Sequence, residues 1–186
     1  HLNTLNNPIA KGLNSLDTPS LFIDSNQNVW VASWYNGIYL LKYGSKRFIN
    51  ISAKSFPEIL KSNRVVSFSE DSKGVIWIGT FLGGLLSYDI KSNILKHYSN
   101  EAFQNAELHN GNIRKVIVYK DDNVWLGTRK GIYQYNQKSK TLRSFNDNIK
   151  AVSEGAISDF IVFSLYEDTN KNIWVGTDGY GLFSYS

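Results

Sequence analysis

The chain has 186 residues, of which 42% are hydrophobic, and its 20 basic and 16 acidic residues give a net charge of +4. This composition excludes an intrinsically disordered chain, and no apolar run approaches the roughly 20 residues that span a bilayer. Cys is absent, which excludes disulfides, thiolate zinc sites and a cysteine nucleophile. The basic residues are scattered along the sequence, so we expect no nucleic-acid partner. Without a long apolar run, we expect no membrane contact within this segment. Because Met is absent too, we expect a piece of a longer protein.

Four copies of one motif organise the sequence. The copies read IDSNQNVWVASWYNGIYLL, EDSKGVIWIGTFLGGLLSY, YKDDNVWLGTRKGIYQY and EDTNKNIWVGTDGYGLFSY. The spacings between their tryptophans are 47, 48 and 49 residues, for Trp30, Trp77, Trp125 and Trp174. A repeat of nearly constant length in this range indicates a solenoid or a propeller.

Each repeat is expected to contain short strands rich in β-branched and aromatic residues. The first strands are predicted at 20–23, 65–68, 113–119 and 161–166, and the second strands at 29–32, 75–79, 124–127 and 173–176. The third strands are predicted at 38–41, 85–88, 132–135 and 182–185, and fourth strands at 48–51, 94–98 and 141–145. The last repeat ends before a fourth strand.

Four short strands joined by tight turns are typical of one blade of a β-propeller. We therefore predict an all-β fold of four consecutive four-stranded antiparallel blades, at about 14–62, 63–111, 112–157 and 158–186, after a connector or the end of a preceding strand at 1–13. Two alternatives to part of a larger propeller stay open. One is a self-closed four-bladed ring, in which residues 1–6 would supply the missing strand, and the other is a half-ring that dimerises.

The repeat motifs E-D-x-x-G/K-x-I-W-I/V-G-T and G-x-G-L-x-x-Y resemble the two-component regulator propeller repeat over nearly all of residues 14–186. The first copy departs from it with VAS after its Trp, and the third copy is shortened. The resemblance implies propellers of about seven blades in the periplasmic sensor region of a bacterial hybrid two-component histidine kinase of the Bacteroides type, which regulates polysaccharide utilisation. It also implies an oligosaccharide ligand. The two open edges of four blades predict a homodimer or neighbouring blades as partners, and we expect no cofactor.

In propellers of this strand order, two sets of loops lie at the same end, around the central channel of the propeller. They are the turns between second and third strands and the connections that enter the first strands. Aromatic rings beside polar groups suit a sugar there, because rings stack on the apolar side of a pyranose while polar groups bond its hydroxyls. The alternative is that these aromatic side chains pack on neighbouring blades. The candidate ligand-binding residues are Trp34, Tyr35, Asn36, Arg64, Phe81, Arg114, Arg129, Lys130, Asp159, Asp178 and Tyr180.

Two turns, starting at Asp24 and Asp168, have the 1, 3, 5 oxygen spacing with which calcium loops begin, but no acidic residue stands at the twelfth position. We interpret them as hairpin turns and predict no metal site. We also predict no catalytic constellation, because no Ser-His-Asp or phosphate-binding motif occurs and the acids at the channel mouth are only Asp159 and Asp178. The predicted function is therefore ligand sensing, and the alternative is a structural or protein-binding propeller.

Overall fold

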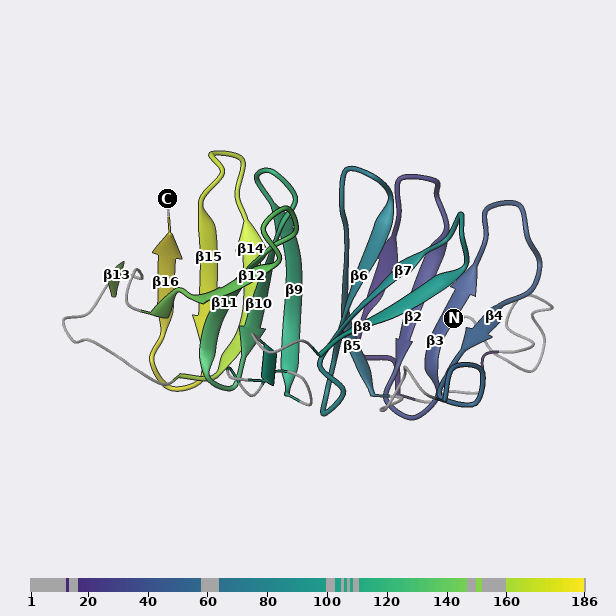
Figure 1. Cartoon of the computed structure of the whole chain (residues 1–186), viewed down its shortest axis with the longest axis horizontal. Helices are drawn as coiled ribbons and strands as arrows, with labels where there is room; N and C mark the ends of the chain where they lie inside the picture. The colour runs from purple at the N-terminus through teal and green to yellow at the C-terminus, as the bar shows by residue number, and fades with distance from the viewer. Residues whose placement is uncertain are drawn as a thin grey trace.

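The computed structural model describes residues 13, 17–57, 64–99, 103, 104, 106, 108, 111–146, 150, 151 and 160–185. Within them, the strands form four four-stranded antiparallel sheets, which lie side by side in chain order along the molecule (Figure 1). We call the sheets blades 1 to 4, in the order of the repeats. The predicted all-β class and the four-stranded antiparallel blades are confirmed.

The strands follow the repeats closely. Blade 1 contains β1 (Leu21–Ile23), β2 (Val29–Ser33), β3 (Gly37–Leu41) and β4 (Ile49–Ile51), and blade 2 contains β5 (Val65–Glu70), β6 (Val75–Thr80), β7 (Leu85–Asp89) and β8 (Ile94–Tyr98). Blade 3 contains β9 (Ile113–Tyr119), β10 (Asn123–Thr128), β11 (Gly131–Asn136) and β12 (Thr141–Ser144). Blade 4 contains β14 (Val162–Glu167), β15 (Ile173–Thr177), β16 (Leu182–Tyr185) and β13 (Lys150–Ala151).

The fourth position of blade 4 is filled by β13, a strand that precedes the blade in the sequence. Lys150 pairs with Ser184, and Ala151 pairs with Phe183. The sequence analysis predicted no fourth strand for this blade, and a strand of two residues is too short to show alternation. Residues 1–6, which the closed-ring alternative would place here, lie outside the described residues.

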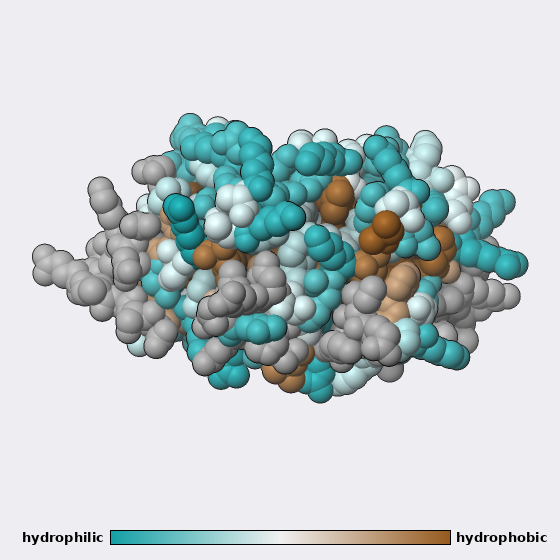
Figure 2. Space-filling view, in the orientation of Figure 1, coloured by the Kyte–Doolittle hydropathy of each residue, from teal (hydrophilic) through white to brown (hydrophobic). Residues whose placement is uncertain are grey.

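The hydrophobic core lies between the blades. Trp30, which is fully buried, packs against Phe68 and Tyr88 of the next blade, with ring centroids 6.1 and 5.8 Å apart. Trp77 and Trp125 occupy the same position between blades 2 and 3 and between blades 3 and 4. The face of the molecule shown in Figure 2 is mainly hydrophilic with small separate hydrophobic patches. Each blade therefore buries its apolar side chains against a neighbour, as repeat units that cannot form a core alone must do.

Glycine after the Trp lets the next blade approach. A Cβ on Gly127 would lie 2.6 Å from Cγ1 of Val162, and one on Gly79 would lie 3.0 Å from Cγ2 of Val116. Both valines belong to the first strand of the following blade. The Gly in the W-x-G-T motif is thus required by the close packing of one blade on the next.

Candidate functional site

The turns that join second to third strands lie along the lower edge of the sheets in Figure 1, beside the segments that enter the first strands. Backbone hydrogen bonds tie the two sets together within a blade. The N–H of Trp34 donates to the carbonyl of Asp17 (3.1 Å), and the N–H of Phe81 donates to the carbonyl of Arg64 (2.8 Å). In blade 4, the N–H of Asp178 donates in the same way to Ile161 (2.9 Å). The two sets of loops predicted to share one end do lie together.

The first strand of blades 2, 3 and 4 contains a bulge near its start. The register shifts between Val65 and Ser67, between Ile113 and Lys115, and between Val162 and Ser164. A bulge leaves one residue unpaired and re-aims its side chain. The residues left unpaired are Val66, Arg114 and Phe163.

These three residues line one hollow of about 500 Å³, to which all four blades contribute. We call it the channel hollow. Pro19, Ser20 and Trp34 come from blade 1 and its entry, and Phe81 comes from blade 2. Blade 3 adds Lys115 beside Arg114, and blade 4 adds residues 163–166, which end with the exposed Tyr166. The hollow combines aromatic rings with two cations, and its described lining contains no carboxylate.

The rim of the channel hollow between blades 1 and 2 is an aromatic pair covered by a cation. The ring centroids of Trp34 and Phe81 lie 5.2 Å apart, and the guanidinium carbon of Arg64 lies 5.8 and 5.7 Å from them. Both rings are half-buried, so part of each packs on the other blade and part faces the hollow. Packing between blades and presentation of a ring surface are combined in this pair. The cation adds electrostatic attraction to the ring faces.

Arg114 and Lys115 hold positive charge inside the channel hollow. The guanidinium carbon of Arg114 lies 4.8 Å from the ring centroid of Phe163, and its Nε is buried with no hydrogen-bond partner among the described residues. Burial lowers the pKa of Lys115, because a charged ammonium loses solvation there. A rigid guanidinium stacked on a ring is well placed to receive an oxygen acceptor.

The structure brings four of the predicted site residues to the channel hollow: Trp34 and Phe81 in its lining, Arg114 within it, and Arg64 at its rim. Tyr35 is 60% exposed and lines an adjoining hollow beside Trp34.

Other predicted residues lie on the same turns but outside the described lining of the channel hollow. Asn36 is held in its turn, where its N–H donates to Oγ of Ser33 (3.0 Å). The members of this group are Asn36, Arg129, Lys130, Asp178 and Tyr180. Asp159 lies outside the described residues. These positions share the end of the blades, but the hollow is formed by other side chains.

Sequence reasoning missed Phe163, Tyr166, Lys115 and Val66, all of which line the channel hollow. They belong to first strands, whereas the candidate residues were taken from the turns and from the segments that enter the first strands. The run IVFSLYED contains more aromatic residues than one buried strand face needs, and this was the available signal for Phe163 and Tyr166. The bulges themselves leave no mark in the sequence pattern.

The turns with calcium-like spacing form hairpins, as interpreted from the sequence. The carboxylate of Asp24 accepts hydrogen bonds from the backbone N–H of Asn28 (2.8 Å) and from Nε1 of Trp30 (2.9 Å). Asp168 accepts the equivalent bonds from Asn172 and Trp174 (both 2.8 Å), and bonds from the Asn172 side chain, from Trp174 and from the turn lower its pKa to about 2. These carboxylates are occupied by their own turns. Among the described residues, no group of acidic, His and Cys side chains could hold a metal ion.

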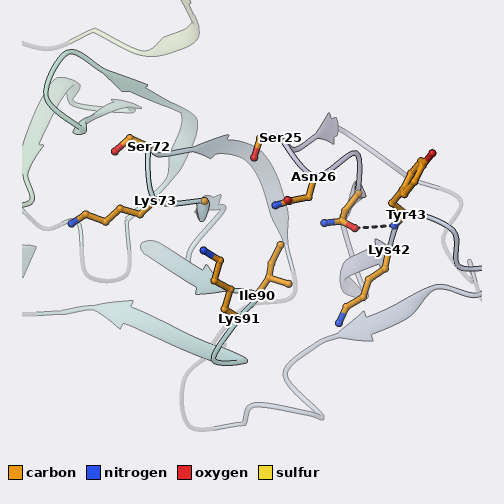
Figure 3. Close-up of a pocket in the computed structure, with 10 residues that line it drawn as sticks. Ser25, Asn26, Lys42, Tyr43, Ser72, Lys73, Ile90 and Lys91 are labelled. Atoms are coloured by element: carbon orange, nitrogen blue, oxygen red, sulfur yellow. Dashed lines mark hydrogen bonds between the residues drawn. The ribbon is translucent and has the colours of Figure 1, made fainter.

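A second hollow, of about 560 Å³, lies at the opposite end of the sheets, between the turns of blades 1 and 2 (Figure 3). Its lining includes Lys42, Lys73 and Lys91, and all three are exposed. Figure 3 shows Lys42 and Lys73 ending on opposite sides of it. Sequence reasoning did not single out this hollow, because its lysines stand in ordinary polar turns.

The four-stranded antiparallel blades pack face to face, and the channel hollow lies at the ends of their first strands. This arrangement defines a segment of a β-propeller. The family described as "Two component regulator propeller" matches residues 59–81 and 155–179. These two stretches match the family that the motifs predicted. In the described part of the chain, no helix is long and apolar enough to cross a membrane.

The relatives place these repeats in longer proteins. The chain is 30% identical over 181 residues to Histidine kinase P4 of Formosa agariphila, covering 94% of this chain and 12% of that protein. It is 25% identical to the extracellular domain of the hybrid two-component system BT4673 from B. thetaiotaomicron, with a TM-score of 0.67, covering 90% of this chain and 20% of that one. The WD40 propeller of Doa1, at 14% identity and a TM-score of 0.63, shares the fold; the alignment covers 91% of this chain and 51% of that one.

Proposed function

We propose that this chain is a ligand-binding propeller segment in the periplasmic sensor region of a hybrid two-component histidine kinase. The proposal is supported by the similarity to Histidine kinase P4 and to the extracellular domain of BT4673. The chain spans 12% and 20% of these proteins, so the kinase activity would belong to other parts of a longer protein.

The ligand that suits the channel hollow is an oligosaccharide, recognised as part of the control of polysaccharide utilisation. The observation that carries this proposal is the hollow of about 500 Å³ in which Trp34, Phe81 and Phe163 lie beside Arg114 and Ser164. Rings of this kind offer flat apolar surfaces to a pyranose, and the polar groups offer hydrogen bonds to its hydroxyls. The described lining contains no carboxylate or histidine, so we propose binding without acid-base catalysis.

A ligand in the channel hollow would act on the arrangement of the blades. Because side chains from all four blades line the hollow, one sugar chain could contact all of them at once. Binding changes an output only by as much as the affinity differs between two states of the sensor. We propose that the state in which the first strands of the four blades lie closest together binds the sugar more tightly.

Calorimetric titration with a panel of polysaccharide fragments tests this function. We expect at least one fragment to bind, and Trp34→Ala or Phe81→Ala to weaken its binding about tenfold or more, as the loss of a stacked aromatic surface does. Tyr43→Ala is the matched control, because Tyr43 is an exposed aromatic residue at the opposite end of the sheets. A protein that binds no fragment, or that loses binding with Tyr43→Ala alone, would contradict the proposal.

The alternative function is docking of another protein or of a second copy of the chain. It is favoured by the exposed apolar side chains of β1, where Leu21 and Ile23 are 70% and 65% exposed. Edge strands with exposed apolar residues invite pairing with another chain. Measurement of the solution mass distinguishes the alternatives, since docking between copies predicts a dimer whose formation requires Leu21 and Ile23.

A further inference from the structure

We infer that the oligosaccharide recognised in the channel hollow is acidic, with a carboxylate or sulfate group that contacts Arg114 and Lys115. This inference rests on the proposed function and names the class of ligand. It begins from the charge of the lining. Arg114 and Lys115 stand next to each other in β9, and the described lining contains no Asp or Glu to balance these two charges. Arg64 stands at the rim.

The side chain of Arg114 is held in place, but its Nε has no acceptor among the described residues. The bulge in β9 turns its side chain out of the ladder, and the guanidinium rests over the ring of Phe163 at 4.8 Å. Its Nε is buried and has no hydrogen-bond partner among the described residues. Buried donors are nearly always satisfied in folded proteins, so an unsatisfied one needs an explanation. An acidic ligand group would supply it, because planar guanidinium groups bind carboxylates and sulfates through two parallel hydrogen bonds.

Lys115 adds a second positive charge next to Arg114. It is half-buried, and the described part of the chain gives its ammonium no ion pair. A buried ammonium without a counter-ion is costly, whereas a paired one is not. Neutral sugars need rings and hydroxyl partners but no uncompensated cations, so the two charges together favour an acidic ligand.

The second hollow is a weaker candidate for the same ligand class. Its three lysines are exposed, and Lys42 and Lys73 end on opposite sides of it (Figure 3). Exposed charges on flexible stems are screened by water and salt. The channel hollow differs because its cations are half-buried and lie beside aromatic rings from blades 1, 2 and 4.

Calorimetry with three matched probes tests the inference on the intact protein. The probes are neutral galactan fragments, sulfated galactan fragments and oligogalacturonides of the same length. We expect one or both acidic probes to bind at least tenfold more tightly than the neutral one, and the comparison of the two acidic probes identifies sulfate or carboxylate as the group. Equal or better binding of the neutral probe would overturn the inference and leave the proposed function intact. Absence of binding by any probe would overturn both.

Variants connect the charge preference to the channel hollow. Arg114→Gln is expected to reduce binding of the acidic probe roughly ten- to a hundredfold, in the range of a lost charged hydrogen bond. Arg129→Gln is the matched control, since it removes one positive charge from an exposed turn outside the hollow. Arg114→Lys keeps the charge without the two-pronged geometry and should give an intermediate loss, provided that its thermal unfolding matches that of the unaltered protein. Equal losses for Arg114→Gln and Arg129→Gln would show general attraction and overturn the inference.

Discussion

The three interfaces between blades and the two end faces of the chain are built from the same repeat positions, but they differ in burial. Trp30, Trp77 and Trp125 are at most 1% exposed, whereas Trp174, which has no following blade among the described residues, is half-buried. The first-strand position opposite the residue after the Trp shows the same contrast. In blades 2 to 4 this position is 0 to 5% exposed and is occupied by Phe68, Val116 and Leu165. In blade 1 it is occupied by Leu21, which is 70% exposed.

The difference shows that burial in this fold belongs to pairs of blades. A Cβ on Gly127 would meet Val162 of the next blade, but one on Gly176 would meet only Ser164 of its own blade. Blade 4 thus carries the Trp half of an interface, and blade 1 carries the half that receives a Trp. We propose that these faces pack against neighbouring blades or against a second copy of the chain.

Replacement of Trp77, which lies between two blades, and of Trp174, which lies on an end face, should give the largest difference in stability. Trp77→Ala removes a fully buried ring and is expected to lower the free energy of unfolding by about 3–5 kcal/mol. Trp174→Ala removes a half-buried ring, so its cost should be less than half as large. Chemical denaturation of both variants measures this. Equal losses would mean that the Trp174 face is already covered in solution.

The glycines give a smaller effect of the same kind. Gly127→Ala places a methyl group 2.6 Å from Val162, and overpacking of this type costs about 1–3 kcal/mol. Gly176→Ala meets only the hydroxyl of Ser164, which can rotate away, so it should cost less. Thermal unfolding of the pair checks the order. A larger loss for Gly176→Ala would contradict the account of close packing between blades.

The pKa of Asp168 tests the turn whose carboxylate accepts a hydrogen bond from Nε1 of Trp174. The carboxylate of Asp168 is held ionised by hydrogen bonds from the Asn172 side chain, from Trp174 and from the turn, which lower its pKa to about 2. Because the folded-state pKa lies below the ordinary carboxyl value, Asp168 stabilises the fold above about pH 4 and loses this effect as the pH falls toward 2. NMR titration of the carboxyl carbon should give a midpoint near 2. A midpoint near 4 would show that these hydrogen bonds are not formed in solution.

Substitution at the exposed end of blade 1 should have the smallest effect on stability. Leu21→Ser is expected to change the free energy of unfolding by at most about 0.5 kcal/mol, because the side chain is 70% exposed. It should also reduce any association between copies, as measured by sedimentation. A loss above about 1 kcal/mol would indicate that another blade covers Leu21.

The repeat pattern predicted the blades well because each strand and turn depends on local residue types. Trp, β-branched residues and Gly recur where packing and turns require them, and the strands follow. The site was predicted in part. Trp34, Phe81 and Arg114 line the hollow, but Arg129 lies outside its described lining.

Topology alone predicts which loops lie at the same end of the blades. Which side chains line a hollow there depends on tertiary geometry. Phe163 was missed because its bulge is visible only in the register with the neighbouring strand. The strand β13 was missed for a related reason, since two residues acquire strand geometry only by pairing with β16. Features set by contact between distant residues were therefore the ones that the sequence pattern left out.

The crystal structure of the protein soaked with the tightest-binding acidic probe tests the central claim most directly. The account predicts a sugar ring stacked on Trp34, Phe81 or Phe163, with its carboxylate or sulfate within hydrogen-bond distance of Arg114. A ligand seated in the second hollow, among Lys42, Lys73 and Lys91, would contradict it.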